Sequence, residues 1–138
     1  VSNTPMELQM IAFQCCVEVS ESIEKPLIIH CVRAFSELIA LKKQWKPAQP
    51  WIFHGFDKNR QTAEMLLGAG CYLSFGAALF REKSHAAESL RATPPDRLFL
   101  ETDDATISIE VVYERAAEIL GIGMGELEGV VLGNFLRF

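Results

Sequence analysis

Short apolar runs alternate along the chain with longer segments in which apolar residues recur every three or four positions. Four runs have the length and composition of buried strands, and they cover residues 26–32, 50–56, 71–75 and 98–102. Segments with helical periodicity surround them, at residues 5–22, 33–45, 62–67, around 80–90, 107–120 and 126–136. Strands that are apolar throughout and alternate with amphipathic helices predict a parallel sheet with helices packed on it, joined by right-handed crossovers.

The length of the chain limits which parallel fold this can be. It has 138 residues, and no linker or low-complexity stretch divides it, so we expect a single domain over residues 1–138. A closed eight-stranded barrel needs about 250 residues. Four strand and helix units therefore predict either a small open α/β sheet or half of a barrel.

Composition narrows the class of protein. Hydrophobic residues make up 49% of the chain and charged residues 22%, which predicts a folded domain with a real core. The formal charge is −5, from 13 Lys and Arg against 18 Asp and Glu, which argues against binding nucleic acid by neutralising phosphates over the whole surface. A local cationic groove or a metal ion could still supply positive charge.

The sequence also bears on the compartment. No apolar run is long enough to span a membrane, and the first residues lack the pattern of a secretion signal, so we expect a soluble protein. The four cysteines, Cys15, Cys16, Cys31 and Cys71, have no CxxC spacing. We expect buried, reduced thiols and a cytoplasmic location.

Candidate chemistry gathers where the predicted strands end. His30 and His54 each stand four residues after a proline that opens a strand, at Pro26 and Pro50, and the fourth strand ends in the acidic run 101–104. In parallel α/β folds, ligands bind at the carboxyl ends of the strands. Because imidazole and carboxylate are ligands for zinc, manganese and magnesium, this pattern predicts a metal or catalytic site. The alternative is that the histidines are structural and the acidic residues cap a helix.

Several segments, taken in order, resemble a known family. The runs PLIIHCVRAF, WIFHGF, YLSFG, DRLFLETD and NFLRF are similar to motifs of the TatD-related metal-dependent hydrolases, which act as deoxyribonucleases. The resemblance covers essentially all 138 residues. It implies that the chain is the C-terminal half of a TIM (β/α)8 barrel, with about four parallel strands and flanking helices.

The resemblance also implies a site. His30 and His54 look like the histidine metal ligands on the fifth and sixth barrel strands. Asp103 looks like the aspartate of the eighth strand, which touches metal and can act as the catalytic group that orients water. The family's first half supplies an HxH pair and a bridging glutamate, and no HxH occurs in this sequence. The residues after His54 and after Asp103 also depart from the family pattern, at 57–59 and 104–105.

The implied activity is hydrolysis of DNA or another phosphodiester with one or two divalent metal ions (Mg, Mn or Zn). Arg33, Lys58 and Arg60 could hold the substrate backbone, or they are ordinary surface charges. Two alternatives remain: a catalytically silent half-barrel that serves as an assembly unit, and a metal-dependent hydrolase of a small ester or amide. We expect little or no nuclease activity from the chain alone, because half of the family's ligands are missing.

A half-barrel also predicts a partner. Its inner face, expected to comprise Ile28, Ile52, Leu73 and Phe99, would lack the opposite half of the barrel. We therefore expect either the missing N-terminal half or a second copy of the chain to cover it.

Overall fold

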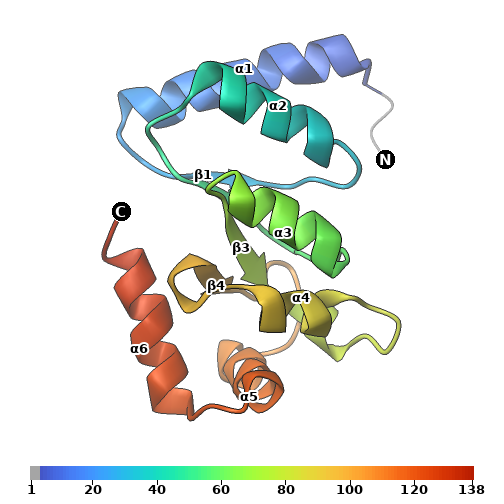
Figure 1. Cartoon of the computed structure of the whole chain (residues 1–138), viewed down its shortest axis with the longest axis vertical. Helices are drawn as coiled ribbons and strands as arrows, with labels where there is room; N and C mark the ends of the chain where they lie inside the picture. Colours follow the sequence, from blue (N-terminus) through green and yellow to red (C-terminus); the bar gives the residue numbers. More distant parts are fainter. Residues whose placement is uncertain (1–3) are drawn as a thin grey trace.

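The computed structural model describes residues 4–138 and contains the predicted parallel sheet (Figure 1). Its four strands are β1 (Leu27–Ile29), β2 (Trp51–Phe53), β3 (Tyr72–Phe75) and β4 (Leu98–Leu100), and they lie in the order β1-β2-β3-β4. All three strand pairs are parallel. Because sequential order equals spatial order, each strand is added to the same side of the one before it, as in a barrel.

Helices follow each strand and precede the first. The α-helices are α1 (Met6–Ser22), α2 (Phe35–Trp45), α3 (Arg60–Gly68), α4 (Ala86–Ala92), α5 (Ile109–Leu120) and α6 (Met124–Phe135), with two short 3-10 helices, η1 (Ala77–Phe80) and η2 (Pro95–Arg97). Helices α1 and α6 lie toward opposite ends of the long axis (Figure 1). Among residues 4–138, no helix has the length and apolar character needed to cross a membrane.

Side-chain caps explain where two of the helices begin. Asn59 accepts a hydrogen bond from the Thr62 N–H at the start of α3, and Ser108 accepts one from the Val111 N–H at the start of α5. The predicted helix around residues 80–90 is instead the 3-10 helix η1 and the separate helix α4. His85, assigned no function, lies at the N-cap of α4 and is exposed.

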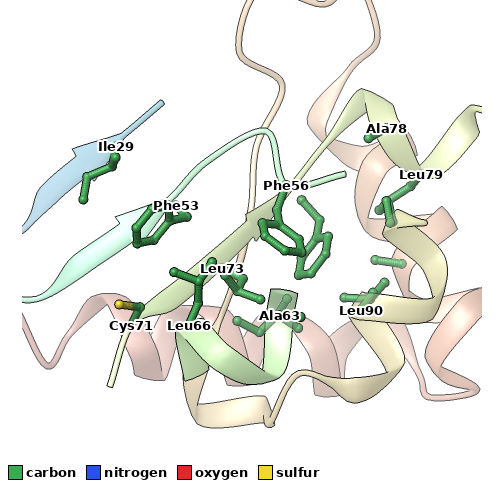
Figure 2. Packing of buried hydrophobic residues seen from close by; sticks show 14 of the residues in the cluster. Ile29, Phe53, Phe56, Ala63, Leu66, Cys71, Leu73, Ala78, Leu79 and Leu90 are labelled. Atoms are coloured by element: carbon green, nitrogen blue, oxygen red, sulfur yellow. The ribbon is translucent and has the colours of Figure 1, made fainter. Parts of the chain in front are cut away.

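The helix-covered face of the sheet carries the main core. One register row across the four strands consists of Ile29, Phe53, Leu73 and Leu98, and none of these residues is more than 5% exposed. They pack in one cluster with residues from the helices, including Ala63, Leu66 and Leu90 (Figure 2). Helices of the same chain therefore bury this row of the sheet.

The opposite face of the sheet is open at the β1 edge, whereas Ile52 and Ser74 on the same face are buried. Ile28 pairs with Ile52 and Ile52 with Tyr72, while Ser74 pairs with Phe99, so these five residues share the inner face. Ile28 is 67% exposed. The expectation that Leu73 belongs to this face is wrong: its register partners are Phe53 and Leu98 on the covered face. Strands that are apolar on both sides show no alternation, so the sequence cannot reveal the direction of each side chain.

A groove of about 700 Å³ runs along this open face, and we call it the inner groove. Apolar residues form most of its wall, among them Ile28, Ile52, Phe99, Phe135, Leu136 and Phe138. The ring of Phe138 lies 5.0 Å from Tyr72 and 5.6 Å from Phe99, between ring centroids. The end of the chain thus covers the part of the open face near the start of β3.

The expectation that all four cysteines are buried is wrong. Cys71 is buried and Cys31 half-buried, but Cys15 and Cys16 are exposed on α1. This helix also exposes apolar residues such as Leu8, Ile11 and Val19. Only part of its apolar surface faces the sheet.

Candidate metal and catalytic site

The predicted histidines lie side by side where β1 and β2 end. Their equivalent positions in neighbouring parallel strands bring the rings of His30 and His54 to 5.1 Å, between centroids. His30 is exposed, and the His54 side chain is 18% exposed at the end of the inner groove. The register of β1 against β2, which pairs Ile29 with Phe53, places these two imidazoles together.

Asp103 reaches the same edge from the loop after β4. Its Oδ2 atom lies 3.9 Å from Nδ1 of His54, and its side chain is 59% exposed. The Asp103 backbone is left-handed, with φ of 48°. Aspartate is among the non-glycine residues that adopt this conformation most readily.

Glu101 also belongs to this site; the sequence placed it in the acidic run at this edge but gave only Asp103 a role as ligand and catalytic group. Its Oε1 atom lies 3.4 Å from Nδ1 of His54 and accepts a hydrogen bond of 2.7 Å from the Gly55 N–H. Its Oε2 atom accepts a hydrogen bond from the Ser74 hydroxyl. One sign of this is present in the sequence, because Ser74 is a polar residue within an otherwise apolar strand. The structure shows that Ser74 is buried, where a polar group needs a hydrogen-bond partner.

The Cys31 thiol, next to His30 in the sequence, is half-buried. Burial raises the pKa of this thiol. A raised pKa favours the protonated thiol, whereas metals bind the thiolate. The exposed donors at this edge are thus the imidazole of His30 and the carboxylate of Asp103, while Cys31 is half-buried.

This donor set has the right chemistry for a divalent metal ion but is only part of a coordination shell. Neutral imidazole and carboxylate are the ligands of zinc, manganese and related ions. Within residues 4–138, however, no group of three or more His, Cys, Asp or Glu side chains is arranged to hold a metal ion. A complete shell requires further ligands or a rearrangement of His30, His54 and Asp103.

The three predicted substrate-binding cations differ in their surroundings. Lys58 forms an ion pair with Asp57 at 2.6 Å, and Arg60 pairs with Glu64 at 2.7 Å. Arg33 is exposed and has no ion-pair partner in the part of the chain that the structure describes. Of the three, Arg33 has the charge most available to an incoming anion.

A parallel sheet with imidazoles and carboxylates at its carboxyl edge is an architecture typical of barrel-type metal-dependent hydrolases. Comparison with known proteins agrees with this class. A family model described as "TatD related DNase" matches residues 1–138, and the chain belongs to this TatD family.

Individual relatives support the assignment. The chain is 29% identical over 136 residues to the "Uncharacterized metal-dependent hydrolase YcfH" of Escherichia coli K12, with 88% of this chain and 51% of the relative covered. It is 30% identical over 100 residues to the "3'-5' ssDNA/RNA exonuclease TatD" of Erwinia billingiae, with 70% and 38% covered. The chain thus spans about half the length or less of these two relatives.

Structural similarity extends over nearly the whole chain. A crystal structure of a TatD family hydrolase from Entamoeba histolytica superimposes with a TM-score of 0.82 at 15% identity. The match covers 99% of this chain and 58% of that protein. It confirms the predicted fold, four parallel strands with flanking helices as in a TatD barrel.

Proposed function

We propose that this chain forms the metal-binding C-terminal half of a barrel that hydrolyses phosphodiesters in nucleic acid. The observation that carries the proposal is the cluster of His30, His54 and Asp103 at the carboxyl edge of the sheet. Family membership supports the reaction class, because TatD relatives are named as metal-dependent hydrolases or exonucleases.

Each group at this edge has a role in the proposed reaction. His30, His54 and Asp103 would hold one or two divalent ions, and such an ion polarises a phosphodiester and promotes deprotonation of water. Asp103 is exposed next to His54, where its carboxylate can orient an attacking water and accept its proton. Arg33, which follows β1, and Lys58 and Arg60, which follow β2, would attract the phosphate backbone.

We further propose that a complementary half-barrel, carrying the remaining metal ligands, covers the inner groove. Both outer strands of the sheet, β1 and β4, have an unpaired edge within the described chain. Their flanking helices expose apolar side chains, Ile11 and Val19 on α1 and Leu132 and Phe135 on α6. The four strands of a complementary half would pair with both edges and close over the groove, and their helices would pack against α1 and α6. Half of the length of the relatives remains to supply them.

A chimera tests this function. The part of a full-length relative that this chain does not match would be joined to residues 1–138, and cleavage of single-stranded DNA measured with magnesium, manganese or zinc. We expect metal-dependent cleavage by the chimera that His54→Ala abolishes. His85→Ala is the matched control, because His85 is an exposed histidine that pairs with Glu88 at the start of α4.

Residues 1–138 alone form the other arm of the experiment. We expect little or no cleavage, because open coordination positions filled by water hold metal less firmly than protein ligands. Strong metal-dependent cleavage by this chain, lost in His54→Ala, would contradict the need for a complementary half. A folded chimera that binds metal but cleaves neither DNA nor RNA would contradict the proposed phosphodiesterase activity.

A catalytically silent assembly unit is the second candidate. It is favoured by the lack of a three-residue metal group among the described side chains. Equilibrium dialysis of the chimera against zinc or manganese separates the two candidates. Loss of bound metal in His30→Ala and His54→Ala supports the metal site, whereas unchanged binding in both variants supports the silent unit.

A further inference from the structure

Glu101 joins the ends of three neighbouring strands. It follows β4, and its carboxylate accepts hydrogen bonds from the Ser74 hydroxyl on β3 and from the Gly55 N–H after β2. Ser74 is only 4% exposed, and the Glu101 side chain 18%. Both carboxylate oxygens therefore have donors already, which defines their positions at the edge of the sheet.

The surrounding backbone leaves space for this glutamate. A Cβ atom on Gly76 would lie 2.7 Å from the Glu101 carbonyl oxygen and 3.0 Å from its Cγ atom. Gly55, whose N–H donates to Glu101, has φ of 59°, a conformation that residues other than glycine rarely adopt. Gly76, after β3, thus permits the close approach of Glu101, and Gly55, after β2, permits the left-handed backbone of the residue that donates to it.

Nδ1 of His54 lies beside this carboxylate, at ion-pair distance rather than in hydrogen-bond geometry. The distance to Glu101 Oε1 is 3.4 Å, compared with 3.9 Å to the more exposed Asp103. A carboxylate beside one ring nitrogen favours a proton on that nitrogen, which leaves the other nitrogen with its lone pair free to bind a metal.

We infer that Glu101 is a positioning residue that holds the His54 ring with its proton on Nδ1 and presents Nε2 to the metal. The part that concerns the metal rests on the proposed function. The part that concerns the ring does not, because it follows from contacts within the chain itself. Glu101 is not itself proposed as a ligand, because its carboxylate accepts hydrogen bonds from Gly55 and Ser74 and lies on the Nδ1 side of the His54 ring.

Nitrogen-15 NMR of the histidine rings in the metal-free chain tests this inference directly. At a pH above the range in which histidine titrates, the ring nitrogen shifts report which nitrogen carries the proton. A free imidazole side chain in water prefers the proton on Nε2. We expect His54 to show the Nδ1–H form, and Glu101→Ala to return it to the pattern of a free side chain. Glu101→Gln retains an acceptor oxygen, so it should retain more of the Nδ1–H form than Glu101→Ala does.

Two further variants separate a specific effect of the Glu101 carboxylate from a general loss of folded structure. Ser74→Ala removes one donor to Glu101 without changing its charge, and it should produce a smaller shift in the same direction. Asp104→Asn removes an exposed carboxylate three residues away and should leave His54 unchanged. The backbone amide spectrum of each variant shows whether it remains folded. Should Glu101→Ala unfold the chain, Glu101→Gln and Ser74→Ala decide the question.

Zinc affinity of the chimera supplies the second readout. Loss of a carboxylate that orients a metal-binding histidine reduces metal affinity by roughly 10 to 100-fold, and we expect this range for Glu101→Ala and no change for Asp104→Asn. An unchanged proton distribution on His54 in folded Glu101 variants would overturn the inference. A changed distribution together with unchanged zinc affinity would retain the positioning of the ring and refute the proposed role of His54 as a ligand.

Discussion

The two faces of the sheet differ in how complete they are. On the covered face, the row Ile29, Phe53, Leu73 and Leu98 is almost fully buried beneath helices of the same chain (Figure 2). On the inner face, Ile28 at the β1 edge is exposed to solvent, and Ile28 and Ile52 line the inner groove. Local crossovers can build the outer layer of a barrel from one half, but the inner layer requires strands from the other half.

The largest contrast is expected between Leu73 and Ile28. Leu73→Ala removes a side chain with no exposed surface and should lower the free energy of unfolding by about 2–5 kcal/mol. Ile28→Ala, at 67% exposure, should change it by only about 0.5 kcal/mol or less. Urea denaturation of the two variants measures both values. Equal losses would show that something covers the inner face in solution.

Gly76→Ala tests the junction between the covered face and the site. The added methyl group would meet the Glu101 carbonyl oxygen at 2.7 Å, so either β3 or the loop after β4 must move. We expect a loss of about 1–3 kcal/mol in denaturation experiments. Gly129→Ala in α6 is the control, because the added methyl group meets no atom within 4 Å and the variant should be neutral or stabilising. Gly70 is not suitable as a control site, because its φ of 75° would strain any other residue.

Alkaline pH should lower the free energy of unfolding, because it ionises the buried thiol of Cys71. Burial raises the pKa of this thiol from 9.0 to about 11. Because the folded-state pKa lies above the unfolded value, the contribution to stability is complete below pH 9.0 and is lost as pH rises toward 11. At about 1.4 kcal/mol per pKa unit, the free energy of unfolding should fall by about 2 kcal/mol over this range.

The difference between wild type and Cys71→Ala isolates this contribution from other groups that titrate at high pH. The gap in unfolding free energy between the two proteins should narrow as pH rises from 9.0 to 11. Cys15→Ala provides the control, since Cys15 is exposed and no such narrowing is expected. A gap that stays constant in Cys71→Ala would contradict burial of the thiol.

The smallest effect on stability, but the clearest one on assembly, should come from Ile28→Lys. We expect the wild-type chain at tens of micromolar to associate in light scattering or to bind a hydrophobic dye through the inner groove. A lysine at the exposed Ile28 should reduce both. Met65→Lys, at another exposed apolar position on α3, should not. A monodisperse wild-type monomer that binds no dye would contradict an open apolar face.

Much of the fold follows from local pattern in the sequence. Apolar runs and helical periodicity predicted all four strands and the sheet type, because these patterns reflect burial of residues near one another in the chain. Equivalent positions at the ends of two strands likewise predicted that His30 and His54 would lie together. The helix around residues 80–90 was predicted wrongly, since its apolar residues pack as a 3-10 turn and a separate helix.

Tertiary structure decided the rest, and the reason is register. The apolar residues of β3 could face either side, and only its pairing with β2 and β4 placed Leu73 against the helices and Ser74 on the inner face. That placement, in turn, brings Ser74 to Glu101 across 27 residues of chain, and Glu101 to Gly55 across 46. Spacing within one segment determined which residues end the strands, whereas contacts between distant segments determined which carboxylate faces His54.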